Sequence, residues 1–330
     1  MTRFPFAALI ASAAAMAILQ AAADDSSAAL GAGGLVLTKA ADIRMAAEDL
    51  KISPDAVSIR YEFVNDSGRD IDTLAAFPLP DIDTWNFYEE PIGRTTNDPL
   101  NFVDFKATAD GKSVSIQVEQ RAFYNGKDVT AIIKSTGVPL NGITGIAVQR
   151  LDKLARDKKR ILEKAGLAEA EAPDQEHPRW IVRTRFYWMQ HFPAGKTMVI
   201  THSYKPVSGQ AFFTEYDLNA KAGTEGAYWK KAYCMDEGTL TRAKVALAER
   251  KASGQNEGML NAHSTDFILK TANNWKGGIG RFRLSIDKGK PENILSLCWN
   301  GDLKRSGPAT FEFTREDFSP AQDLKFVVLE

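Results

Sequence analysis

Apolar and polar residues alternate in short runs along most of this chain. Residues 57–64 alternate in this way, residues 65–68 (Asn-Asp-Ser-Gly) have the composition of a turn, and the alternation resumes toward Phe77, which predicts a β-hairpin. A second hairpin is predicted within "KATADGKSVSIQVEQRAF", with Asp110-Gly111 as its turn. Further strands are predicted in "GRFRLSIDKGKPENILSLCWN", "ATFEFT" and "LKFVVLE". So many short strands between turn residues predict a mainly β fold made of antiparallel β-sandwich-like domains.

Two segments carry a helical period of apolar residues. "VQRLDKLARDKKRILEKAGL" predicts an amphipathic helix that ends at Gly166, with one apolar stripe formed by Val148, Leu151, Leu154, Leu162 and Ala165. The acidic, proline-containing "AEAEAPDQEHP" that follows is expected to be a linker. A second helix is predicted in "TLTRAKVALAER", with its cap near Thr239 and its end before Gly254.

The length of the chain sets an expectation for its domains. A mature chain of about 300 residues is long enough for more than one hydrophobic core. The predicted order is a β-sandwich-like domain at 24–147, an amphipathic helix with an acidic linker at 148–178, and a β-rich domain at 179–330 with a helix near 239–252.

The first 23 residues have the pattern of a secretory signal peptide. Arg3 precedes the apolar run "FPFAALIASAAAMAILQ", and three alanines precede the acidic stretch that begins at Asp24, so cleavage is expected after Ala23. A membrane anchor is the alternative, but the run is short and rich in alanine for a spanning helix. The chain is therefore expected to be periplasmic, with no stable membrane insertion after cleavage.

The charge balance and the two cysteines bear on which ligands and bonds are expected. The chain has 41 Lys and Arg against 42 Asp and Glu, and this near-neutral balance gives no support for nucleic-acid binding. Its two cysteines, Cys234 and Cys298, are predicted to form a structural disulfide in an oxidising compartment. A catalytic thiol and a pair of metal ligands are the alternatives, but the chain has no C-x-x-C spacing.

Two of the four histidines lie in "FYWMQHFPAGKTMVITHSYKP", which raises the question of a metal site. A hairpin that turns at residues 193–195 would place Phe192 opposite Thr197. His191 and His202 would then share a face four pairs apart, ~13 Å along the strands, which is too far for both to hold one zinc ion. The segment is therefore interpreted as one face of a sheet, and neither a metal site nor a cofactor is expected.

The loop "PDIDTWNFYEEP" is the strongest candidate for binding. Its rings, Trp85, Phe87 and Tyr88, could stack on a sugar or anchor a partner protein, or they could instead cover the open end of a sandwich. The loop also contains four acids, Asp81, Asp83, Glu89 and Glu90. A pair of them could serve a carbohydrate-active hydrolase, but closely spaced acids are common in a charged chain. "DGKSV" lacks the first glycine of a phosphate-binding loop.

Several longer stretches carry a family resemblance. "MAAEDLKISPDAVSIRYEFVN", "FPLPDI", "TANNWKGGIGRFRLSIDKGKPENILSLCWNG" and "DFSPAQDL" resemble the bacterial exported family described as domain of unknown function 4424, over about 24–330. The resemblance implies an envelope protein and no particular activity. The expected function is a non-catalytic binding or assembly protein of the cell envelope, with an envelope protein or a glycan as partner. A carbohydrate-active envelope hydrolase using loop carboxylates is the alternative.

Overall fold

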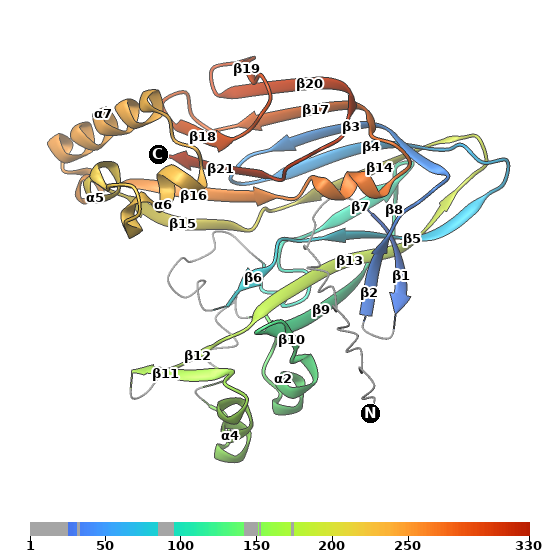
Figure 1. Ribbon diagram of the computed structural model, residues 1–330, viewed down its shortest axis with the longest axis horizontal. Helices are drawn as coiled ribbons and strands as arrows, with labels where there is room; N and C mark the ends of the chain where they lie inside the picture. Colours follow the sequence, from blue (N-terminus) through green and yellow to red (C-terminus); the bar gives the residue numbers. More distant parts are fainter. Residues whose placement is uncertain (1–25, 32–33, 85–95, 142–150, 152, 173–174) are drawn as a thin grey trace, which may run out of the picture.

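Three β-sheets, here called A, B and C, carry most of the chain, as the computed structural model shows (Figure 1). The structure describes residues 26–330 except 32–33, 85–95, 142–150, 152 and 173–174. Sheets A and B lie face to face, and sheet C continues the sandwich toward a group of helices. The predicted mainly β, sandwich-like fold is confirmed.

Sheet A contains seven strands. In order across the sheet they are β10 (Lys127–Asp128), β9 (Gln117–Tyr124), β13 (Ile181–Phe192), β5 (Ile71–Pro78), β1 (Ser26–Gly31) and β2 (Gly34–Thr38), and β6 (Ile82–Asp83) pairs with one end of β13. All of its described pairings are antiparallel.

Sheet B contains eight strands. In order they are β19 (Lys304–Arg305), β20 (Thr310–Phe318), β17 (Ile279–Asp287), β3 (Ile43–Ile52), β4 (Val57–Asn65), β14 (Thr197–Tyr204), β7 (Lys106–Ala109) and β8 (Lys112–Ser113). β17 runs parallel to β3, so this sheet is mixed and not purely antiparallel as expected. The β7–β8 pair confirms the predicted turn at Asp110-Gly111.

Sheet C is covered on one face by helices. Its strands are β15 (Ser208–Phe213), β16 (Leu260–Phe267), β21 (Leu324–Leu329) and β18 (Ile294–Cys298). The helical elements around it are α5 (Glu215–Asn219), η1 (Glu225–Ala227), α6 (Tyr228–Ala232), α7 (Glu237–Ser253) and η2 (Gln255–Gly258). A further short helix, η3 (Lys270–Asn274), lies beside β1 and borders the main core. Trp229, Tyr233 and Leu247 pack from α6 and α7 onto Leu260 and Val327, which forms a second, smaller core.

Aromatic side chains fill the space between sheets A and B. Phe186 of β13 stacks on Phe105 with their ring centroids 4.4 Å apart, and Phe63 of β4 meets Phe192 of β13 at 5.8 Å. These residues occupy alternate positions of their strands, as expected when one face of each sheet is buried. The outward positions of β13 hold polar side chains together with exposed apolar ones such as Met189.

Two predicted hairpins are wrong, because the strands on either side of each turn lie in different sheets. β4 belongs to sheet B and β5 to sheet A, and in the same way β13 belongs to sheet A and β14 to sheet B. Phe192 pairs with Ile71, and Thr197 pairs with Val64. Both strands of each pair have an apolar, aromatic-rich face, and a crossing between sheets buries these two faces against each other, which a flat hairpin would not do.

Asn65 joins the two crossings. Its Nδ2 donates to the backbone oxygens of Arg69 and Phe192, each at 2.8 Å, and its Oδ1 accepts from the backbone N–H of Ser67 at 2.9 Å. The N–H of Gly195 donates to the carbonyl oxygen of Asn65 at 2.9 Å. A buried side chain with this many backbone partners holds both turns in one arrangement.

The helices differ in how well the sequence predicts them. α7 confirms the second predicted helix. Asp236 caps its N-terminus, because Oδ1 of Asp236 accepts from the N–H of Thr239 at 2.7 Å. Gly254, with a φ of 68°, caps its C-terminus. The first predicted helix is shorter than expected, because α4 (Arg156–Lys164) begins after Leu151 and Leu154. None of the helices in the described part of the chain is long and apolar enough to cross a membrane.

The segment predicted as a linker is a small hairpin, which corrects that expectation. β11 (Ala168–Ala172) pairs with β12 (Gln175–Pro178), close to α4 and to α2 (Thr130–Thr136) at the lower edge of Figure 1. Strands from both sides of this region share sheets A and B. The division into domains at 147 and 179 stays a prediction.

Candidate functional site

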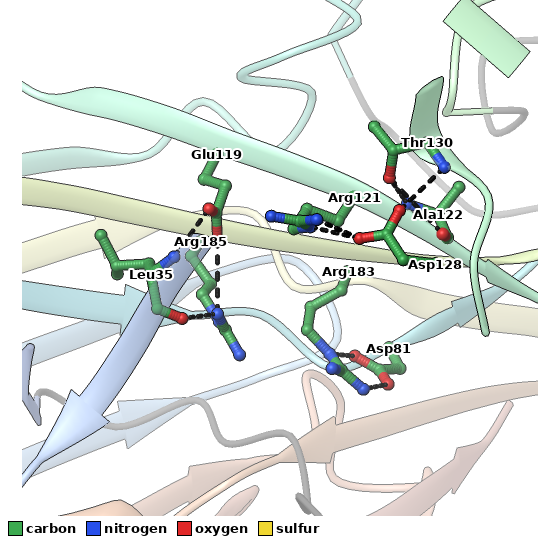
Figure 2. A network of polar contacts seen from close by, with 9 residues as sticks. All are labelled: Leu35, Asp81, Glu119, Arg121, Ala122, Asp128, Thr130, Arg183 and Arg185. Atoms are coloured by element: carbon green, nitrogen blue, oxygen red, sulfur yellow. Dashed lines mark hydrogen bonds and ion pairs between the residues drawn. The ribbon is translucent and has the colours of Figure 1, made fainter. Parts of the chain in front are cut away.

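Three arginines lie close together on the outer face of sheet A (Figure 2). Arg183 and Arg185 alternate with buried residues along β13, and Arg121 of β9 lies directly opposite Arg183. We call Arg121, Arg183 and Arg185 the arginine row. Two cations placed opposite each other on neighbouring strands repel, so this arrangement needs carboxylates beside it.

Arg183 is held by Asp81, which follows β5. Its Nε donates to Oδ1 at 3.0 Å and its Nη2 to Oδ2 at 2.7 Å, so the planar guanidinium and the carboxylate form a two-pronged pair. The guanidinium carbon also lies 4.6 Å from the ring centroid of Phe123 on β9. The ring and the carboxylate together fix the direction of this side chain.

Arg121 is held by Asp128 of β10. Its Nε donates to Oδ2 of Asp128 at 2.7 Å, and its Nη2 donates to the same oxygen. The backbone N–H of Thr130 donates to Oδ1 at 2.9 Å. Burial would raise the pKa of Asp128, but the hydrogen bonds from Thr130 and Arg121 outweigh it and lower the pKa. Asp128 is therefore held as a carboxylate.

Arg185 is the most enclosed member of the row, with only 12% of its side chain exposed. Its Nη1 donates to Oε2 of Glu119 at 3.3 Å and to the carbonyl oxygen of Leu35, whose own N–H donates to Oε1 of Glu119 at 2.8 Å. Burial lowers the pKa of Arg185, and Glu119 opposes that shift. These contacts join β2 to β9 and β13, which are not its neighbours in the sheet.

The segment that carries the predicted binding rings begins beside the arginine row. Asp81 precedes β6, and Thr84 donates from its Oγ1 to the carbonyl oxygen of Trp180 at 2.7 Å. On the returning side, Gln120 of β9 donates from Nε2 to the carbonyl oxygen of Pro99 at 2.8 Å. Thr84 is therefore held next to the start of β13, and Pro99 is held on β9. Trp85, Phe87 and Tyr88 themselves lie outside the described residues.

The arginine row is better suited to binding a ligand than to acid–base catalysis. A guanidinium has five N–H donors, and the described contacts of Arg183 use only Nε and Nη2. Both oxygens of Asp81 accept from Arg183, so this carboxylate is committed to its partner and is poorly placed to act as a general base. Within the described ranges, no group of three His, Cys, Asp or Glu side chains is placed to hold a metal ion.

The two histidines considered as metal ligands, His191 and His202, do not share a face. His191 is exposed, and its Nδ1 lies 2.8 Å from Oδ1 of Asp72. His202 is buried between the sheets, with its ring centroid 5.4 Å from that of Trp188. The predicted register is wrong because β13 and β14 are in different sheets.

None of the three arginines is among the site residues predicted from the sequence. Their signal is present in "WIVRTRFYW", where Arg183 and Arg185 stand two residues apart and each is flanked by residues that face the core. On a strand, this spacing places both on the outer face. That Arg121 and three carboxylates join them depends on strand pairing, which the pattern does not specify.

Comparisons with known proteins place the chain in a family. The model of the family described as "Domain of unknown function (DUF4424)" matches residues 23–327. No curated protein matches the chain. Among solved structures, the chain is similar to a Legionella pneumophila protein described as a candidate nutrient-binding protein, with 15% identity, a TM-score of 0.46, and coverage of 93% of this chain and 70% of that one.

Proposed function

This chain belongs to the DUF4424 family, and from that premise we propose that it is a non-catalytic binding or assembly protein of the cell envelope. Its contact surface is the arginine row on the outer face of sheet A. The observation that carries the proposal is the two-pronged Arg183–Asp81 pair, which holds a partly exposed guanidinium in a fixed direction. The partner is an envelope protein or a glycan.

Three properties of the arginine row support ligand binding and not catalysis. Its cations are neutralised by carboxylates, so an incoming ligand meets fixed hydrogen-bonding groups and little net charge. The side chains stand on paired strands, which are more rigid than a loop. Arginine beside an aromatic ring is also a combination enriched where proteins bind one another.

The rival function is a carbohydrate-active hydrolase that uses carboxylates of residues 81–90. It would need a pair of acids free to donate and accept a proton on either side of a sugar bond. Asp81 is engaged at both oxygens by Arg183, and Glu89 and Glu90 lie outside the described residues. The binding function is therefore the better supported of the two.

Export is the second part of the proposal. Residues 1–23 have the pattern of a signal peptide, and they lie outside the described residues. Protein purified from the periplasmic fraction should begin at or near Asp24 when its N-terminus is sequenced. Protein that keeps Met1 and sediments with membranes would contradict the proposal.

Photo-crosslinking in living cells tests the contact surface. A benzophenone amino acid at Ile181, which is 40% exposed on β13 beside the row, should give discrete adducts with an envelope component. The matched control is the same group at Val245, which is 54% exposed on α7 at the far end of the molecule (Figure 1). It should give no adduct of that mass.

A substitution tests whether Arg183 itself contributes to binding or whether Ile181 is merely close to the partner. Arg183→Met keeps an apolar stem over Phe123 and removes the fork that pairs with Asp81, so the adduct at Ile181 should fall by about fivefold or more. The melting temperature is measured alongside and should change little, because a partly exposed ion pair contributes only about 1 kcal/mol. Equal adducts from the two labelled positions, or an adduct unaffected by Arg183→Met, would contradict the proposed surface.

A further inference from the structure

A second hollow lies away from the arginine row, on the helical side of sheet C. Its volume is about 420 Å³, and it is formed by α5 and the turn that leads to η1. Its lining consists of Glu215, Tyr216, Asn219, Ala220, Lys221 and Thr224. In Figure 1 these elements lie beside α6 and α7 at the upper left, away from β10 and α2 in the lower part of the view.

An exposed tyrosine ring forms one wall of this hollow. Tyr216 is 66% exposed although it is a large aromatic residue. Its ring lies against the backbone of Gly226: a Cβ added at Gly226 would fall 2.6 Å from Cε1 and 2.9 Å from Cδ1 of the ring. Only glycine leaves room for the ring at this position, so the backbone supports it from behind while it stays open to solvent.

The other walls are held in place by hydrogen bonds. Thr224 donates from its hydroxyl to the carbonyl oxygen of Lys221 at 2.7 Å, and Lys230 of α6 donates from Nζ to the carbonyl oxygen of Ala220 at 2.8 Å. Glu215 lies 3.3 Å from Nζ of Lys251 on α7. The hollow is therefore shaped before any ligand arrives, which lowers the entropic cost of binding.

The chemistry of the lining favours an uncharged molecule with many hydroxyls. Asn219 and Lys221 can donate, while the Glu215 carboxylate and the Asn219 and Thr224 oxygens can accept. The lining holds one carboxylate, Glu215, and one ammonium group, Lys221, so it carries no net charge that would select an ion of either sign. Sugar hydroxyls both donate and accept, and the C–H face of a pyranose ring is apolar enough to lie on a tyrosine ring.

We propose that this hollow is a subsite for one pyranose ring of a glycan, with Tyr216 as the stacking platform. It goes beyond the proposed function, because it lies on other elements than the arginine row and does not depend on that surface. A loss of sugar binding here would leave the crosslink at Ile181 unchanged, so the two can fail separately.

Saturation-transfer NMR on the full mature chain tests the subsite. The probes are the methyl glycosides of glucose, galactose, N-acetylglucosamine and N-acetylgalactosamine. At least one should receive saturation on the C–H protons of one ring face. Tyr216→Ala should weaken its binding about fivefold or more, and Tyr216→Phe should stay within about twofold, because the ring and not its hydroxyl makes the platform.

Two further variants guard against a trivial loss of structure. Gly226→Ala should weaken binding in the same direction as Tyr216→Ala, since its Cβ would displace the ring while Tyr216 itself remains. Phe212→Ala removes another exposed aromatic ring, on β15, and should leave binding unchanged. No transfer to any of the four sugars, or transfer that survives both Tyr216→Ala and Gly226→Ala, would overturn the proposal.

Discussion

Lowering the pH from 7 to 5 should reduce the free energy of unfolding by about 2 kcal/mol through His202 alone. Burial between the two sheets lowers the pKa of this histidine from 6.5 to about 3. The folded state therefore keeps the ring neutral at a pH where the unfolded chain binds a proton. Because the unfolded state binds more protons, stability is lost progressively as the pH falls from about 6.5 toward 3.

The surroundings of His202 provide a matched variant. Its ring lies within 5.4 Å, centroid to centroid, of four aromatic rings: those of Tyr61, Phe77, Phe105 and Trp188. His202→Phe places another aromatic ring among them and removes the titrating group, so the difference in pH dependence between the two proteins isolates this histidine.

Urea unfolding of both proteins at pH 7, 6, 5 and 4 measures the effect. The wild-type protein should lose about 2 kcal/mol more than His202→Phe between pH 7 and pH 5. His191→Asn serves as the control, because that histidine is exposed in the fold and should leave the difference in place. Parallel pH profiles for wild type and His202→Phe would show that the burial of His202 does not govern acid stability.

Breaking the disulfide should lower the free energy of unfolding by roughly 2–4 kcal/mol. The structure contains the predicted bond between Cys234 and Cys298, 64 residues apart in sequence. Cys234 lies between α6 and α7, and Cys298 ends β18, so the bond ties the helical layer to sheet C. Without it, the unfolded chain gains the entropy of a long open loop.

Single and double variants separate the effect of losing the bond from the effect of changing each side chain. Cys234→Ser and Cys298→Ser should each lower the free energy of unfolding by a similar amount. The double variant should be no less stable than the less stable single variant, because both substitutions break the same bond. Reduced wild-type protein should match the double variant in urea unfolding. Two free thiols in denatured, unreduced periplasmic protein, or unchanged stability on reduction, would contradict the prediction.

Local patterns predict those elements whose signals lie close together in the sequence. α7 is set by an acidic cap and a terminal glycine, and the β7–β8 turn by Asp110-Gly111, so both follow from neighbouring residues. The 57–77 and 186–206 segments show where such patterns stop. Alternation identifies their strands and buried faces, but a strand after a tight turn can pair beside its neighbour or cross to face it, and both choices bury the same residues.

The candidate site depended on choices of that second kind. The outward positions of Arg183 and Arg185 follow from alternation along β13, yet the placing of Arg121 opposite Arg183 required the pairing of strands about 60 residues apart. Asp81 reaches the row from the link between β5 and β6, and Leu35 reaches it from β2. The hollow at Tyr216 likewise requires α5 and η1 to meet. In the sequence its one signal is Gly226, which no local pattern distinguishes from the other glycines.

The sequence by itself determined the family, the mainly β composition, the facing of most strands and the pairing of two cysteines, because each depends on periodicity, composition or the simple absence of other partners. Only the tertiary structure decided which strands share a sheet, where β17 meets β3 in parallel, and which charges surround the arginine row. The physical reason is that many pairings bury the same alternating faces. The choice among them rests on aromatic packing across two sheets and on hydrogen bonds such as those of Asn65, which join residues distant in sequence.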